Sequence, residues 1–418
     1  MINQIVSIAA ILSTTLIFLV GNGLVNTLIP VRAHIAGFST FSIGLVGSAY
    51  FAGFVVGCFV GPRWLARVGH IRTFAVCAGL AAATTLTQSI AIGVFSWIAT
   101  RAMFGFAAAA MYMTLESWLN DRATNETRGR ILASYVIVNL SFLLLGQWLL
   151  LAAPPEGFQL FSIAAIVYIF CIVPVGLTQL PQPVPQAAPR FRIRRLVDMA
   201  PVGVAGVITV GLANGAFWTL APVYAQSLGF STFGIALFMS VFILGGALIQ
   251  IPLGRYSDVI DRRWLITAAC GAACLGGLAL AFLGRAEIST PAWLYPCAFL
   301  FGAAMLPLYS ISIAHSNDRM ARGEFVEASA SLLLINGIAS VAGPMLAALV
   351  TARFGQPSLF FYTAAIHLAM TGFAIWRITR ADAVPKSRRE HYVAVPQLAS
   401  PKSLELDPRA GEPPTIAA

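Results

Sequence analysis

The chain has 418 residues, of which 58% are hydrophobic and only 10% charged. Soluble globular domains carry about 25% charged residues, so this composition excludes that class and indicates an integral membrane protein. The net charge of +10 would also suit a protein that binds nucleic acid, so the placement of the basic residues has to decide between the two.

Apolar stretches long enough to cross a bilayer recur along the whole chain. A transmembrane helix needs about 20 apolar residues, and we predict twelve helices, at residues 6–31, 41–61, 73–92, 95–119, 131–151, 158–180, 202–224, 232–252, 265–283, 294–314, 326–350 and 359–377. The first stretch lacks a preceding basic region and exceeds the length of a signal-peptide core, so we expect it to be retained.

The basic residues fall almost entirely on one side of this predicted topology. Of the 26 Lys and Arg residues, Arg32, Arg285 and Arg353 lie in connections on the opposite side, and Arg101 lies within the fourth predicted helix. Cytoplasmic loops of membrane proteins carry the excess of Lys and Arg. We therefore predict a multi-pass protein of the cell inner (plasma) membrane with both termini in the cytoplasm, and no nucleic-acid partner.

The two halves of the chain repeat each other. Residues 22–43 and 214–235, which lie 192 positions apart, are identical at 13 of 22 positions. A shift of 197 places Gly105 on Gly302 and Asn139 on Asn336. Two halves in the same orientation indicate a parallel repeat about an axis along the membrane normal, with a substrate site between the halves near the midplane. This organisation favours a transporter.

The repeat also divides the chain into parts. We predict an N-terminal six-helix half at residues 1–180, a cytoplasmic linker at 181–200 and a C-terminal six-helix half at 201–380. Residues 381–418 are polar, Pro-rich and aperiodic, so we expect a disordered cytoplasmic tail. The predicted fold class is an all-α integral membrane protein with twelve transmembrane helices in two pseudo-symmetric halves.

Several motifs resemble the major facilitator superfamily (MFS) over roughly residues 6–380. The loop signature of that family, G-x-x-x-D-R-x-G-R-R, is matched after the eighth predicted helix by Gly254, Asp258, Arg262 and Arg263. After the second predicted helix only Arg67 and Gly69 match, and Ala66 stands in place of the aspartate. The strings LESWLND around Glu116, RGRILASY at 128–135 and LGQ at 145–147 look like the YcaD-like branch, which is similar to drug/proton antiporters.

The resemblance implies the MFS fold and secondary active transport of a small molecule through a lipid bilayer. It implies gating roles for Arg67, Asp258, Arg262 and Arg263, and a role in coupling protons to transport for Arg101, which with Gly105 matches the family's R-x-x-x-G pattern. Helices 1 and 7 face the cavity in this family, which makes Asn22, Asn26, Asn214 and Trp218 candidates to line it.

Two charged residues of the fourth predicted helix stand out. Arginine is costly within a membrane and is normally kept for a partner or a transport pathway, although Arg101 could instead reach outward to the interface. Glu116 lies about 22 Å further along the same helix, so the two cannot pair directly. Glu116 could carry protons during transport, clasp Arg67 or Arg130 at an inner gate, or mark the end of the helix.

The remaining polar residues have two readings as well. An amide in hydrocarbon needs a hydrogen-bonding partner, which is either a substrate or a neighbouring helix. Tyr112, Asn139 and Asn336 are weaker cavity candidates than the asparagines of the first helix, and contacts between helices are the simpler reading for each. At the helix ends, we expect Asp121 and Asp318 to be solvated loop charges, and His367 to pack within the twelfth predicted helix.

The sequence contains no Walker loop, H-E-x-x-H or G-x-S-x-G motif, and the thiols of Cys270 and Cys274 have no His or carboxylate neighbour. We therefore predict no enzymatic activity, no metal and no cofactor. The preferred function is a monomeric, proton-coupled permease for a small neutral or amphipathic cargo, with efflux favoured over uptake. The alternative is a membrane sensor or scaffold that keeps the transporter fold without turnover.

Overall fold

The computed structural model describes residues 2–121, 123, 128–177, 183, 191–286, 291–320, 324–385, 389, 391–397, 400, 401 and 403. Within these residues the regular elements are helices, and twelve of their segments are long and apolar enough to cross a membrane. Each of them overlaps one of the twelve predicted stretches. The predicted count of transmembrane helices is therefore confirmed.

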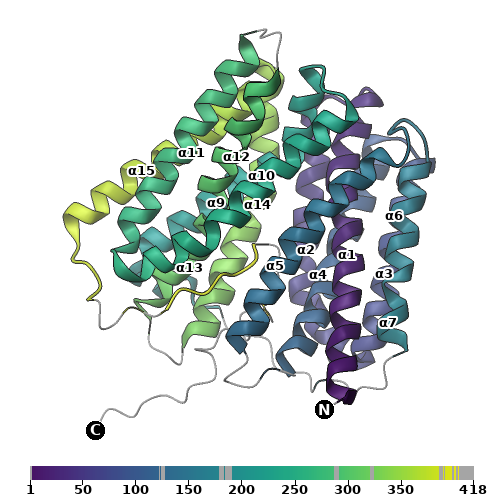
Figure 1. Cartoon of the computed structure of the whole chain (residues 1–418), viewed down its shortest axis with the longest axis horizontal. Helices are drawn as coiled ribbons and strands as arrows, with labels where there is room; N and C mark the ends of the chain where they lie inside the picture. Colours follow the sequence, from purple (N-terminus) through teal and green to yellow (C-terminus); the bar gives the residue numbers. More distant parts are fainter. Residues whose placement is uncertain are drawn as a thin grey trace.

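The N-terminal half forms one bundle (Figure 1). Its helices are α1 (Ile2–Ile35), α2 (Thr40–Val68), α3 (His70–Ile90), α4 (Val94–Asp121), α5 (Arg128–Trp148) with the 3-10 turn η1 (Leu149–Leu151), α6 (Gln159–Phe170) and α7 (Ile172–Gly176). The α6 and α7 helices follow each other closely and together make up the sixth span.

The C-terminal half forms the second bundle. A short helix, α8 (Ile193–Met199), precedes it, and its elements are α9 (Pro201–Ser227), α10 (Thr232–Val259), α11 (Arg262–Arg285), η2 (Pro291–Trp293), α12 (Leu294–Met305), α13 (Leu308–Asn317), α14 (Phe325–Phe354) and α15 (Ser358–Arg380). The tenth span is divided into α12 and α13 because Pro307 lacks the backbone N–H that a continuous helix needs there.

The sequence repeat produces the same turn in both halves. Gly37 and Gly229, 192 positions apart, both have positive φ angles, of 77° and 79°, which glycine adopts without strain. The hydroxyl oxygens of Ser39 and Ser231 then cap α2 and α10 by accepting a hydrogen bond from the backbone N–H three residues later. The repeated GFSTF run thus ends one helix and begins the next.

The repeat also extends to helix packing. The α-carbon of Gly53 in α2 faces the carbonyl of Ala102 in α4, and that of Gly245 in α10 faces the carbonyl of Phe299 in α12. Each contact is so close that a Cβ on the glycine would overlap the facing carbonyl oxygen. Small residues permit such close approach between membrane helices. The same backbone contact therefore holds α2 on α4 and α10 on α12.

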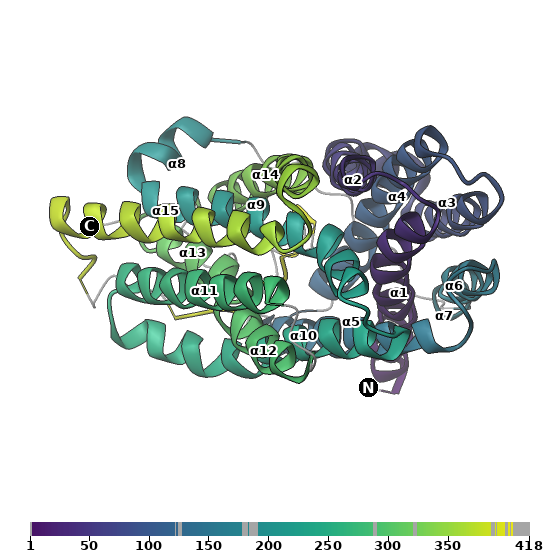
Figure 2. The same cartoon turned by 90° about the horizontal axis from the view of Figure 1, so that it is seen from above.

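The two bundles lie side by side, with α2 against α14 and α5 against α10 (Figure 2). We call the side with the α1–α2 and α9–α10 turns the loop side, and the side with α8 the linker side. On the loop side, His34 contacts Gln226 and the Gln356 amide donates to the Thr40 hydroxyl. These bonds join the two halves directly.

Two expectations about loops need revision. The described residues of the segment 381–418 contact the transmembrane helices, although we expected a disordered tail, because their polar groups find partners between the two halves. Asp318 is not a solvated loop charge, since it is buried and ion-paired with Arg262. Both differences arise from partners that are distant in sequence.

Candidate functional site

A pocket lies between the halves, toward the loop side. It is bounded by α1, α2, α4 and α9, and its lining is mostly apolar, including Ile29, Ile43, Val46 and Phe51. Three predicted site residues meet in it, namely Asn26, Arg101 and Trp218. The structure thus brings together residues from both halves of the chain.

Arg101 is the one positive charge that lines this pocket among the described residues. Its side chain is buried, with 5% of the residue exposed, and its guanidinium carbon lies 4.7 Å from the ring centre of Tyr50 and 5.1 Å from that of Phe104. Within the described part of the chain it makes no hydrogen bond or ion pair, and its Nε and Nη1 atoms are buried without a partner. Aromatic faces rather than a carboxylate therefore stabilise its charge.

Asn22 has partners within the N-terminal half. Its amide nitrogen donates to the Tyr112 hydroxyl at 3.3 Å, and its amide oxygen accepts from the Tyr168 hydroxyl at 3.1 Å. These bonds tie α1 to α4 and α6. In this structure Asn22, expected to line the cavity, bonds to neighbouring helices, and so does Tyr112, for which contact between helices was the simpler expectation.

Glu116 is fully buried toward the linker side of α4. Its carboxylate accepts hydrogen bonds from the Tyr135 hydroxyl at 2.9 Å and from the backbone N–H and hydroxyl of Ser400. Tyr135 belongs to α5, whereas Ser400 belongs to the segment that follows α15. Glu116 therefore contacts the C-terminal segment rather than Arg67.

Asn214 and Asn336 face the same region from the other half. The Asn214 amide donates to the Gln397 side chain, and its own oxygen has no partner among the described residues. Asn336 lines a second pocket together with Phe54, Cys58 and Gln397. Asn139 of α5 is buried, and its amide nitrogen has no partner in the described part.

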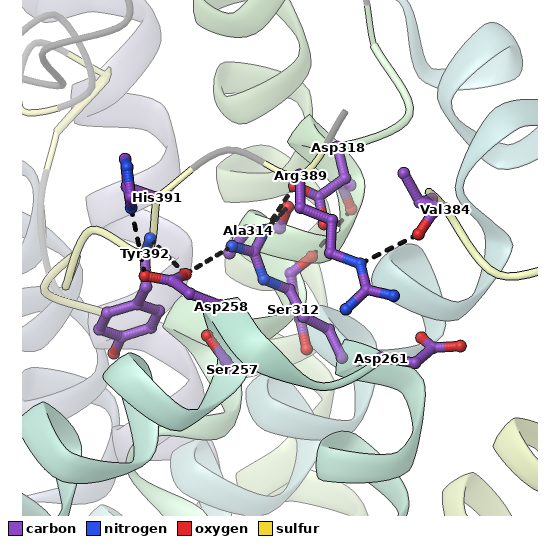
Figure 3. A network of polar contacts seen from close by, with 12 residues as sticks. Ser257, Asp258, Asp261, Ser312, Ala314, Asp318, Val384, Arg389, His391 and Tyr392 are labelled. Carbon is purple, nitrogen blue, oxygen red and sulfur yellow. Dashed lines mark hydrogen bonds and ion pairs between the residues drawn. The ribbon is translucent and has the colours of Figure 1, made fainter. Parts of the chain in front are cut away.

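Arg262 organises a network of charges on the linker side of the C-terminal half. Figure 3 labels its partners Asp258, Ala314 and Asp318. Arg262 contacts Asp318 at 2.5 Å, the carbonyl of Ala314 at 2.8 Å and Asp258 at 3.0 Å. Asp258 also accepts a hydrogen bond from the backbone N–H of Tyr392 at 2.7 Å. Through Arg262 the two aspartates thus connect α10, α11 and α13. Asp258 also binds the backbone of the segment that follows α15.

Tyr392 anchors that segment against α10. Its ring packs on Gly254, where a Cβ would overlap it, so this glycine of the loop signature provides the space for the ring. Burial raises the pKa of Tyr392 to about 12, so its hydroxyl stays protonated at neutral pH.

The other two arginines of the loop signatures lie outside this network. Arg263 pairs with Asp261 at 2.7 Å and donates to the carbonyl of Ala381 at 2.7 Å, which fixes the end of α15. Burial opposes ionisation of Asp261, but the hydrogen bonds and charge of Arg263 outweigh it and hold its pKa below the ordinary 3.8. Arg67 is exposed and contacts no carboxylate among the described residues.

Some contacts between elements were missed by sequence reasoning. His34 and Gln226 occupy corresponding positions of the repeat, and the shift of 192 could have singled them out as residues near the symmetry axis. Gln147 of α5 accepts from Thr27 and donates to the carbonyl of Gly23. For Ser400 and Gln397 the sequence carries no signal, because nothing in it pairs the C-terminal segment with Glu116 or Asn214.

The profile of the Major Facilitator Superfamily matches residues 11–201 and 203–410, nearly the whole chain. The chain belongs to this superfamily. It is also similar to the MFS-type transporter YcaD of Salmonella typhi, with 27% identity over 343 residues, which cover 82% of this chain and 88% of YcaD. The predicted family and fold class are therefore confirmed.

Solved MFS structures show the same fold. The nucleoside transporter NupG superposes with a TM-score of 0.68 at 14% identity, covering 91% of this chain and all of that one. A bacterial homologue of the human lysosomal transporter Spinster, in an inward-facing and unoccupied conformation, gives 0.65 at 13% identity, covering 91% of this chain and 95% of that one. An MFS protein of this architecture is a multi-pass membrane transporter.

Proposed function

We propose that the chain is a proton-coupled secondary active transporter that moves a small molecule across the bacterial inner membrane by alternating access, with efflux favoured over uptake. The observation that carries this proposal is the unequal separation of the halves. His34 and Gln226 join them directly on the loop side, whereas residues of the C-terminal segment lie between them on the linker side. A site between halves that approach each other on one side at a time fits alternating access.

We assign the proton-carrying step to Glu116. It is a buried carboxyl group that faces the space between the halves, where Ser400 reaches it. A carboxyl group that is alternately buried and hydrated binds and releases a proton as its surroundings change. Arg101 keeps its charge at all working pH values, so it contributes to coupling by acting on an anion and not by proton transfer.

We assign gating to the Arg262 network with Asp258, together with the neighbouring contacts of Arg263 to Asp261 and Ala381. These contacts link α10, α11, α13 and the end of α15 on the linker side, which is the side that has to close when the halves rock. With the N-terminus in the cytoplasm, as the distribution of basic residues predicts, the linker side is cytoplasmic. The structure then corresponds to an inward-facing state.

The test is a flux measurement. A thermal-shift screen of the purified protein selects stabilising compounds, and their flux is then followed in proteoliposomes with and without a pH gradient. We expect gradient-driven accumulation in the parent, and in Glu116→Gln we expect exchange at zero gradient without accumulation. Glu156→Gln, in the loop before α6, is the control. Binding without flux for every stabilising compound would instead favour the sensor or scaffold.

A further inference from the structure

We infer that the pocket around Arg101 binds the carboxylate of an amphipathic organic acid. This inference rests on the proposed transport function and names the class of cargo. The first observation is the unpaired charge. Arg101 is buried, and the part of the chain that the structure describes gives it no anion. A buried cation without a counter-ion is costly, so an anion that enters the pocket gains a strong electrostatic interaction.

The second observation is that other hydrogen-bonding groups in the pocket are unpaired too. The Asn26 amide and the Tyr50 hydroxyl line the pocket beside Arg101, and among the described residues neither side chain makes a hydrogen bond. By contrast, Asn22, one helical turn before Asn26, has both a donor and an acceptor partner. The unpaired donors therefore gather at one place.

The lining selects the type of anion. With a single cation, the pocket cannot neutralise a polyanion, and the planar guanidinium fork matches the two oxygens of a carboxylate. Trp218, Phe51 and Val46 provide an apolar surface for the rest of the ligand. An acid with an apolar or aromatic body fits these features best.

The experiment compares acids with their uncharged amides. The probes are octanoate and 4-phenylbutyrate with octanamide and 4-phenylbutanamide, and affinities are taken from concentration-dependent thermal shifts of the full chain. We expect each acid to bind at least tenfold more tightly than its amide. Arg101→Ala should abolish this preference, and Arg101→Lys should keep part of it because the charge remains without the fork.

Arg285→Ala is the matched control. Arg285 also lies over an aromatic ring, that of Phe361 at 4.8 Å, but it is exposed at the end of α11 and outside the pocket. This variant should keep the preference for acids. If Arg101→Ala is not monodisperse, Asn26→Ala replaces it, and it should weaken acid binding severalfold with Arg101 intact. Equal binding of acids and amides by the parent, or an unchanged preference in the Arg101 and Asn26 variants, would overturn the inference.

The readout separates this inference from the transport proposal, because binding is measured at equilibrium without a membrane gradient. If acids bind through Arg101 but are never transported across the proteoliposome membrane, the transport proposal is refuted and the binding-site inference still holds. If neutral compounds are transported and acids are not preferred, the inference of a carboxylate site is refuted and the transport proposal still holds.

A second and independent observation concerns the C-terminal segment, by which we mean the described residues 391–397, 400, 401 and 403. We propose that this segment is a plug that prevents the halves from closing on the linker side. On the C-terminal half, Tyr392 bonds to Asp258, and the backbone of Val395 makes two hydrogen bonds to the Ser310 hydroxyl, at 3.0 and 3.1 Å. On the N-terminal half, Ser400 bonds to Glu116.

The plug thus spans both halves. In Figure 1 the yellow chain after α15 passes α13 and runs toward the space between the bundles. Gln397 and Pro401 line the second pocket together with Phe54 and Phe191, in the space that α2 and α14 border. Helices cannot meet where a peptide occupies the space between them, so closure requires that the segment leave.

Cys58 provides a readout of the plug, because it lines the same pocket. In a chain with the other five cysteines replaced by serine, we expect Ser400→Pro with Gln397→Ala to increase the rate of N-ethylmaleimide labelling of Cys58 at least fivefold. Ser400→Pro removes the two donors that Ser400 supplies to Glu116, and Gln397→Ala removes the acceptor for Asn214. Deletion of residues 391–418 should give the same increase.

The control is deletion of residues 404–418 alone, which leaves every contact above in place and should keep the parent's labelling rate. Increased flux in the same variants would further support the plug. Parent-like labelling after deletion of 391–418, in protein that remains monodisperse, would refute it.

Discussion

The Nδ1 atom of His34 lies 2.9 Å from the Oε1 atom of Gln226, and these residues occupy the same position of the two halves, 192 residues apart. Residues at corresponding positions meet only near the axis that relates the halves. The ends of α1 and α9 therefore converge on this axis at the loop side.

This convergence gives a cross-linking prediction. In a cysteine-free background, His34→Cys with Gln226→Cys should react with a short bifunctional thiol reagent, and the cross-link should stop flux because the loop side can no longer open. Reductant should restore flux when the reagent is cleavable. Each single variant treated in the same way is the control, and full flux in the cross-linked double variant would contradict this view of the loop side.

The charges around Arg262 give a stability prediction. Asp318→Asn should lower the midpoint of thermal unfolding more than Asp258→Asn does, because the Asp318 side chain is 2% exposed and that of Asp258 is 27% exposed. Removing one member of a buried ion pair costs about 3–5 kcal/mol, and a partly hydrated charge costs less. Unfolding is followed by intrinsic fluorescence in detergent. Equal shifts would mean that burial does not determine the strength of this network.

The repeated glycine contact gives a packing prediction. Gly53→Ala and Gly245→Ala should each destabilise the protein by about 1–3 kcal/mol, because the new methyl group overlaps a carbonyl oxygen of the facing helix. Gly79→Ala and Gly271→Ala are controls, since a Cβ at either position meets nothing within 4 Å. Yields of monodisperse protein and unfolding temperatures provide the measurement. Similar losses in all four variants would assign the effect to glycine itself and not to its contact.

The distribution of basic residues gives a topology prediction. Reporter fusions after Leu180 and after Arg380 should both report the cytoplasm, and a fusion after Gly37 should report the periplasm. A periplasmic signal at either of the first two points would reverse the assignment of the linker side.

The sequence by itself determined the helices, their number and the duplication. Transmembrane helices satisfy their backbone hydrogen bonds locally, so a run of apolar residues suffices to predict each of them. The resemblance to the MFS family, in which helices 1 and 7 face the cavity, made Asn26 and Trp218 candidates to line it, and both line the pocket between the halves. The loop signature singled out Asp258 and Arg262 before their contact was known.

The tertiary structure decided which polar residues have partners. Asn22 and Asn26 are alike in the sequence, yet one bonds to Tyr112 and Tyr168 while the other lines the pocket of Arg101, because they lie one helical turn apart along α1 and meet different neighbours at each level. Asp318 and Ser400 gained buried partners that lie far away in the chain. Hydrophobic patterning reports the burial of apolar groups, whereas a polar contact depends on the position of both partners, which only the packed helices fix.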